Sequence, residues 1–210
     1  MKKRILCGIL AVFCLLSGMI NVVSATNIGY DISYWYSNVD NMGTWASDSL
    51  DVYVGTNSSY SSLTTANLKS YLNTAKTSWS CTGVSFNYVS QQSSADLVLG
   101  GITSSEATQL AIPNNVVGIT YSNASTQIAT LYYGAQEKRL YRIDSATVFL
   151  IESSQASTTA GAKKLTVHEI GHALGYFGHY DNGTVMTTYY EHMTSTTPSA
   201  AERNHLGQLH

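Results

Sequence analysis

The chain has 210 residues, of which 11% are charged and 44% are hydrophobic. This composition suits one domain with a substantial core and excludes collagenous, coiled-coil and charge-rich disordered chains. The formal net charge is −2, and it becomes −5, with 8 basic against 13 acidic residues, if the basic residues at positions 2–4 are removed. An acidic chain does not suit nucleic acid or anionic lipid, so we expect neither as a partner.

The first 25 residues have the pattern of a secretory signal peptide. A basic start precedes an apolar stretch at residues 5–20, and small side chains at Val23 and Ala25 suit a signal peptidase. We expect cleavage after Ala25, which leaves a secreted protein of one domain, residues 26–210, and we expect this protein to be a monomer. The alternative is an uncleaved membrane anchor, but polar and small residues at 17–21 weaken the apolar run, so no stable membrane insertion is expected after leader removal.

With its leader removed, the chain cannot form an internal disulfide. Cys7 and Cys14 belong to the leader, which leaves Cys81 alone. Cys81 lies between a predicted helix and a predicted strand, and we expect it to be buried. Packing or a bound metal must then stabilise the domain.

Strands are predicted along most of the chain. Residues 27–49 are rich in Tyr and Trp and fit either a lead-in strand or a loop. Beyond them, β-branched and aromatic residues in short apolar runs predict strands at 50–55, 84–89, 95–102, 116–122, 128–133 and 146–152. The run at 95–102 is apolar enough to be buried on both faces.

Three helices alternate with these strands. The first carries an apolar face at helical spacing, with Ser62 or Thr64 as its N-cap. Its face consists of Leu68, Tyr71, Leu72, Ala75 and Trp79. A second helix is expected at 163–177, after a loop of small residues at 153–162, and a third near the chain end, where a capping box spans Ser199–Glu202. The elements together predict a mixed α+β fold with one main sheet.

The histidines carry the strongest chemical signal. All six lie in the last quarter of the chain. His168 and His172 are four residues apart on a predicted helix, so their imidazoles share one face and can bind one zinc ion. Glu169 completes an H-E-x-x-H pattern, in which the glutamate does not bind the metal but accepts and returns protons for a metal-bound water. Gly175 permits the positive φ at which the helix ends and the chain turns, which brings His179 within reach as a third ligand.

The segment HEIGHALGYFGHYDNGTVM, residues 168–186, resembles the metzincin zinc endopeptidases and especially their matrixin-like members. Their pattern is H-E-x-x-H-x-x-G-x-x-H followed by a turn that contains methionine, and Met186 stands where that turn is expected. His179 lies one residue further from the glycine than usual, a spacing similar to that of archaemetzincin-like members. Asp181 is the alternative third ligand, because an aspartate fills this place in some relatives. A looser similarity covers residues 50–210.

The resemblance implies a twisted, mostly parallel sheet of about five strands with an antiparallel edge strand, two long helices and a C-terminal helix. It implies one catalytic Zn²⁺, with Glu169 as general base and Met186 as a hydrophobic floor. The implied zinc ligands are His168, His172 and His179. Tyr189 and Tyr190 are candidate oxyanion donors or walls of the substrate pocket. No D-x-D-x-D-G loop is present, so calcium is not supported.

The implied function is that of a secreted zinc endopeptidase. Its substrate would be an extended polypeptide that adds to a sheet edge, either 116–121 or 128–133, by main-chain hydrogen bonds. The alternative is a secreted, zinc-stabilised binding protein without turnover. We expect structural or surface roles for the remaining histidines, His192, His205 and His210.

Overall fold

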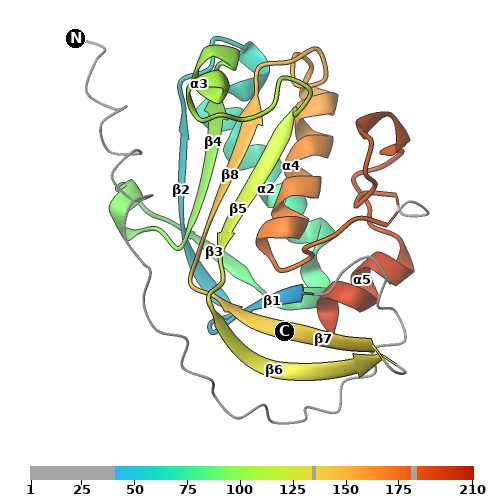
Figure 1. The fold of residues 1–210 in the computed structure, drawn as a ribbon. Helices are drawn as coiled ribbons and strands as arrows, with labels where there is room; N and C mark the ends of the chain where they lie inside the picture. The colour runs from blue at the N-terminus through green and yellow to red at the C-terminus, as the bar shows by residue number, and fades with distance from the viewer. Residues whose placement is uncertain (1–40, 134–135, 181–183) are drawn as a thin grey trace.

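The structure is a computed structural model, and it describes residues 41–133, 136–180 and 184–210 (Figure 1). The predicted leader and its cleavage site lie outside the described residues and stay predictions. Within the described ranges, no helix combines the length and the apolar character that crossing a bilayer requires.

A five-stranded sheet forms the centre of the molecule, in the order β3-β2-β4-β8-β5. Its strands are β2 (Ser49–Thr56), β3 (Ser85–Tyr88), β4 (Leu97–Ile102), β5 (Gly118–Asn123) and β8 (Ser145–Ile151). The pairs β2–β3, β2–β4 and β4–β8 are parallel, whereas β5 lies antiparallel to β8 at the sheet edge. This confirms the mostly parallel sheet with an antiparallel edge strand.

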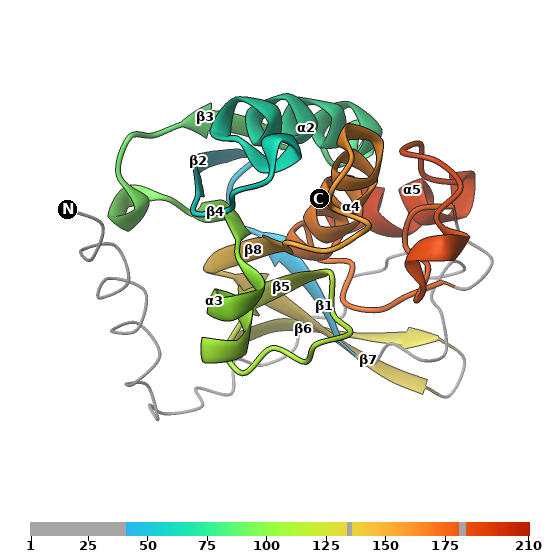
Figure 2. The ribbon, with the colours of Figure 1, turned by 90° about the horizontal axis from the view of Figure 1, so that it is seen from above.

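Two long helices, α2 (Thr65–Ser78) and α4 (Thr159–Ala173), pack side by side on one face of this sheet (Figure 2). The predicted apolar face of α2 is confirmed, with Leu68 and Leu72 fully buried, and Thr64 caps the helix by accepting a hydrogen bond from the Asn67 N–H. A short helix, α3 (Ser104–Gln109), lies on the opposite face, where a second, smaller core cluster forms (Figure 2). Because both faces are covered, β4 is almost entirely buried, as predicted.

Helix α5 (Ala200–Gly207) is the last helix of the described residues, and it begins at the predicted capping box. Ser199 accepts a hydrogen bond from the Glu202 N–H, and the Glu202 side chain accepts one from the Ser199 N–H. The described residues also form four single-turn 3₁₀ helices: η2 (Ser61–Leu63), η3 (Ser80–Thr82), η4 (Gln92–Ser94) and η5 (Tyr190–His192).

A second sheet of three strands was not predicted. It consists of β1 (Asn41–Trp45), β7 (Gln136–Ile143) and β6 (Thr126–Tyr133), with β1 parallel and β6 antiparallel to the central β7. The predicted main sheet is the five-stranded one, and this smaller sheet is an addition to it. The sequence of β7 did not indicate a strand, because a charged residue, Lys138, occupies a position that is only 1% exposed, between the exposed Glu137 and Arg139.

Two expectations are corrected. Helix α4 was expected at 163–177, but it begins earlier, at Thr159, and ends at Ala173, ahead of Gly175. It begins inside the expected loop because the Thr158 side chain caps it by accepting a hydrogen bond from the Gly161 N–H. Cys81 is exposed rather than buried. It lies in η3, where the neighbouring Thr82 takes the buried position and its hydroxyl donates to the Trp79 carbonyl.

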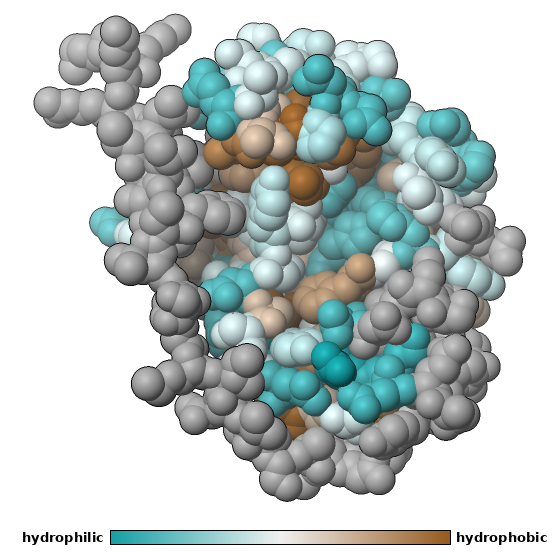
Figure 3. Space-filling view, viewed as in Figure 1, coloured by the Kyte–Doolittle hydropathy of each residue, from teal (hydrophilic) through white to brown (hydrophobic). Residues whose placement is uncertain are grey.

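Hydrophilic residues cover much of the described surface on the face seen in Figure 1, while hydrophobic residues gather over its upper part (Figure 3). The edge strand β5 lies on this side next to α4 (Figure 1). The histidines of α4 thus lie beside an open sheet edge.

Candidate metal centre

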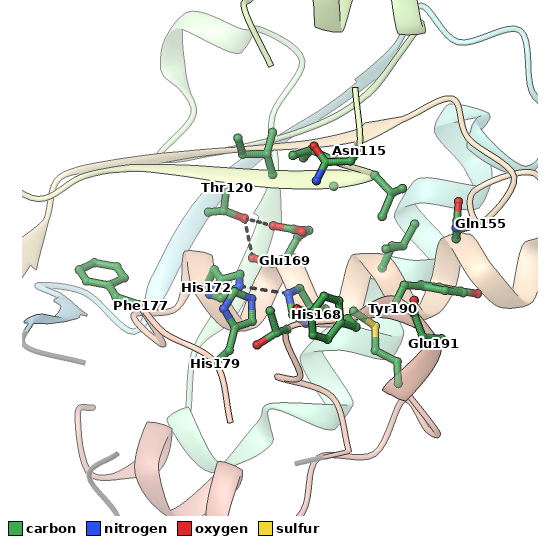
Figure 4. A pocket seen from close by; sticks show the side chains of 18 of the residues that line it. Asn115, Thr120, Gln155, His168, Glu169, His172, Phe177, His179, Tyr190 and Glu191 are labelled. Carbon is green, nitrogen blue, oxygen red and sulfur yellow. Dashed lines mark hydrogen bonds between the residues drawn. The ribbon is translucent and has the colours of Figure 1, made fainter. Parts of the chain in front are cut away.

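Three histidine side chains converge near the C-terminal end of α4, and their ligand nitrogens all lie within 4.8 Å of one another (Figure 4). They are His168, His172 and His179. The first two lie one helical turn apart on α4, as their spacing predicts. The third comes from the segment that follows the turn at Gly175, where φ is +111°. The structure therefore brings together the three residues that the motif predicts as metal ligands.

Main-chain carbonyls fix the orientation of two of these rings. His168 Nδ1 lies 2.7 Å from the Val185 carbonyl oxygen, and His172 Nδ1 lies 2.5 Å from the Tyr176 carbonyl oxygen. A carbonyl only accepts hydrogen bonds, so each Nδ1 carries a proton and each Nε2 of a neutral ring is a bare acceptor. The two Nε2 atoms are 3.1 Å apart. Two acceptors this close repel each other unless a proton or a cation lies between or beside them, and imidazole nitrogens suit zinc.

Burial keeps these rings neutral. Desolvation, with a smaller contribution from the nearby His179, lowers the pKa of His168 to about 4, although the hydrogen bond to Val185 acts in the opposite direction. Desolvation and the two neighbouring imidazoles hold the pKa of His172 well below its ordinary value. At neutral pH both rings are therefore in the unprotonated form that metal binding requires.

Glycine at position 175 is required by a close approach as well as by its φ. A Cβ atom added at Gly175 would overlap the carbonyl oxygen of Gly43 in β1. The Gly175 N–H donates to the His172 carbonyl at 3.0 Å, which closes the last turn of the helix. The chain can then reverse toward His179.

Glu169 lies beside the histidines, buried between α4 and β5 (Figure 4). The Thr120 hydroxyl lies 2.7 Å from Glu169 Oε2, and a Cβ added at Gly118 would be 2.7 Å from Glu169 Oε1. Desolvation raises the pKa of Glu169 to about 7, against the lowering effect of the Thr120 hydrogen bond. A carboxyl group with this pKa can accept and release a proton near neutral pH.

Met186 lies directly beneath α4 and is fully buried. A Cβ added at Gly171 would be only 2.6 Å from Met186 Sδ, so this helix position leaves room for the thioether between the two histidines of the motif. The main chain around Met186 is held by Glu202, whose Oε1 accepts hydrogen bonds from the N–H groups of Val185 and Met186.

A cavity of about 820 Å³ opens along the histidines and Glu169. Strand β5 forms one wall, and residues 188–191 together with Met193 form part of the other. Tyr190 lines the cavity with its hydroxyl pointing away from His168 (Figure 4), near Gly161 at the start of α4. Tyr189 also lines it and is 57% exposed. Asp181, the alternative ligand, lies outside the described residues.

The other histidines lie away from the triad. His192 is exposed and stacks edge-on against Tyr189, His205 is fully buried against the ring of Tyr176, and His210 reaches the end of α4. Their placement is consistent with the expected structural or surface roles.

Sequence reasoning missed three residues that shape the site. Thr120 and Gly118 contact Glu169 from β5, and Glu202 holds the main chain around Met186. The strand containing Thr120 was predicted, but no pattern shows which strand residue faces a helix residue far along the chain. Glu202 was visible only as the capping residue of α5.

A known protein family matches this chain over most of its length. The family model described as matrixin matches residues 44–209, which include the three histidines, Glu169 and Met186. No curated protein matches the sequence.

Proposed function

This chain belongs to the matrixin family, and we propose that it is a secreted zinc-dependent endopeptidase that hydrolyses peptide bonds of extended polypeptides. The family supports a zinc metallopeptidase. The observation that carries the proposal is the pair of Nε2 acceptors 3.1 Å apart, beside a buried carboxyl group whose pKa is raised to about 7. If the histidines only packed in the core, the close approach of their two Nε2 acceptors would have no explanation.

In this proposal, the imidazoles of His168, His172 and His179 hold one zinc ion, and the hydrogen bonds from Nδ1 to the Val185 and Tyr176 carbonyls keep two of them oriented. When bound, zinc supplies a Lewis acid that polarises a carbonyl group and lowers the pKa of water toward neutrality.

Glu169 acts as the general base. Its carboxylate accepts the proton of the attacking water and then delivers that proton to the nitrogen of the leaving amine. The raised pKa favours this exchange at neutral pH, since the group is neither permanently ionised nor permanently protonated. Thr120 contributes by holding Oε2, which limits rotation of the carboxylate. Met186 supports the ligands from below as an apolar floor.

The substrate lies along the outer edge of β5. This strand pairs with β8 on one side only and forms one wall of the cavity that contains Glu169. An extended polypeptide can add to such an edge by main-chain hydrogen bonds, which places its peptide bond over the histidines. The other edge predicted for this role, β6, lies in the second sheet. Tyr189 and Tyr190 then line the side of the cavity facing β5.

Secretion rests on the leader-like residues 1–25, and the catalytic domain would comprise residues 26–210. The alternative function is a zinc-stabilised binding protein without turnover. The intact Glu169 beside the histidines argues against it, because a binding protein does not need a buried base at this position.

The test is cleavage of casein or of a quenched peptide by the purified protein. We expect cleavage that a chelator abolishes, and a Glu169→Ala variant that retains its zinc but loses at least about a hundredfold in rate, as expected for removal of a general base. A wild-type protein that binds one zinc and cleaves nothing across a broad peptide library would support the binding protein instead.

A further inference from the structure

The end of helix α4 is held by donors from both ends of the described chain. The last carbonyl groups of a helix lack partners within it and must find them elsewhere. At α4, the buried indole N–H of Trp45 donates to the Ala173 carbonyl at 3.0 Å. The main-chain N–H of Gly43 donates to the Gly175 carbonyl at 3.2 Å. Both donors belong to β1, so this strand contacts the helix end at two points.

The two remaining carbonyls of this turn are also paired. His210 Nε2 lies 2.8 Å from the Leu174 carbonyl oxygen, and His172 Nδ1 lies 2.5 Å from the Tyr176 carbonyl oxygen. The four consecutive carbonyl groups of residues 173–176, which we call the α4 turn, thus each have one donor. One of these donors is a metal-ligand candidate itself.

We propose that Trp45 and His210 are positioning residues for the metal centre. They touch neither the metal-binding nitrogens nor a substrate. They hold the Ala173 and Leu174 carbonyls, and so fix the α4 turn, whose Tyr176 carbonyl orients the His172 ring. The same turn begins the segment that delivers His179. This inference rests on the proposed function in one respect, namely that these histidines bind zinc.

Packing around Gly43 gives the turn little freedom to move while β1 is in place. A Cβ atom added at Gly43 would lie 2.5 Å from Phe177 Cζ and 2.6 Å from Ile143 Cδ1, so the β1 backbone lies directly against the segment between Gly175 and His179. Strand β1 is itself fixed by parallel pairing with β7 along its whole length. The three-stranded sheet therefore acts as a platform on which the α4 turn rests.

A purely structural role would give a different result from a positioning role. If Trp45 and His210 only stabilise the fold, their loss lowers the melting temperature and leaves the intrinsic affinity for zinc unchanged. If they position the turn, their loss also weakens zinc binding and alters the ligand geometry. Removal of groups that orient metal ligands typically costs 10-fold to 100-fold in metal affinity.

The experiment uses the full-length protein, stripped of metal, and the variants Trp45→Phe and His210→Ala. Trp45→Phe keeps an aromatic ring but removes the indole N–H. The zinc dissociation constant is measured by competition with a chromogenic chelator, and the visible absorption spectrum is recorded after loading with Co²⁺. The control is Val52→Ala, which removes fully buried methyl groups from β2 in the main sheet and leaves the α4 turn intact.

We expect the zinc dissociation constant to rise about 10-fold or more in Trp45→Phe and in His210→Ala, with a changed Co²⁺ spectrum. Val52→Ala should lower the melting temperature yet keep the wild-type constant and spectrum. Wild-type zinc affinity and spectrum in both turn variants would overturn the inference. If Trp45→Phe does not fold, His210→Ala alone decides between these results.

Failure of the inference can be told apart from failure of the proposed function. A wild-type protein that binds no zinc contradicts the proposed function and, with it, the positioning role. A wild-type protein that binds one zinc, with variants that bind it equally well, contradicts only the positioning role.

Discussion

Glu202 Oε1 accepts a 2.6 Å hydrogen bond from the main-chain N–H of Met186, which ties helix α5 to the chain beneath the histidines. The same oxygen accepts from the Val185 N–H at 3.0 Å, and Oε2 accepts from the Ser199 N–H at 2.6 Å. Because the Val185 carbonyl in turn orients His168, the carboxylate of Glu202 supports a metal-ligand candidate through the main chain.

The first prediction concerns the stability that Glu202 provides. Glu202→Gln should lower the free energy of unfolding by roughly 2–4 kcal/mol, because an amide NH₂ group then faces buried N–H donors that had a charged acceptor. Glu106→Gln is the matched control, since Glu106 also closes a capping box, with Thr103, but does not reach the metal centre. It should cost only about 0.5–1 kcal/mol. Urea unfolding measures both, and equal losses would refute the special role of Glu202.

The second prediction follows from the pKa of the same group. Desolvation raises the pKa of Glu202, but hydrogen bonds from Met186, Ser199 and Val185 outweigh it, so the pKa lies below the ordinary value of 4.5. The carboxylate then contributes stability that is fully present above pH 4.5 and is lost as the pH falls through the lowered pKa. The difference in unfolding free energy between wild type and Glu202→Gln should shrink in that range. A difference that stays constant into strong acid would contradict the shift.

The third prediction concerns the hydroxyl of Thr120. Its hydrogen bond lowers the pKa of Glu169, which is nevertheless raised to about 7 by desolvation. Thr120→Val removes this bond, so the pKa of Glu169 should rise further. The acid limb of the pH profile of kcat/KM should move to higher pH, because the base must be ionised. Thr120→Ser keeps the hydroxyl and should leave the limb in place; a shift of the same size in both variants would count against this reading.

The fourth prediction decides the third zinc ligand. His179→Ala should bind far less zinc than wild type, because it removes one of three imidazoles whose nitrogens lie within 4.8 Å of one another. Asp181→Ala should retain its zinc. Metal analysis of both proteins after dialysis gives the answer, and an equal loss in the two variants would show that the assignment of His179 is wrong.

The main sheet and the site histidines were predictable from sequence because their signals are local. Apolar runs marked the strands, the i, i+4 spacing placed His168 and His172 on one helix face, and the glycine at 175 marked the turn. The Ser199–Glu202 capping box likewise located the start of α5 to the residue. In each case the determining residues lie within a few positions of one another.

The features of the fold and the site that could not be predicted from the sequence depend on contacts between distant segments. The strand β7 was missed because Lys138 fills a buried position where an apolar residue is expected. Cys81 was placed inside because free cysteines are usually buried, whereas a 3₁₀ turn rotates it outward. The contacts of Trp45 with α4 and of Thr120 with Glu169 join residues 128 and 49 positions apart, which no periodicity encodes.

The most direct test of the central claim is a titration of the metal-free protein with zinc while cleavage of a quenched peptide is followed. If His168, His172 and His179 hold one catalytic zinc, the cleavage rate should rise in proportion to added zinc and level off at one ion per chain. Glu169→Ala should bind the same single ion without a rise in rate. Cleavage at the full rate before any zinc is added, or no cleavage once one zinc is bound, would contradict the account.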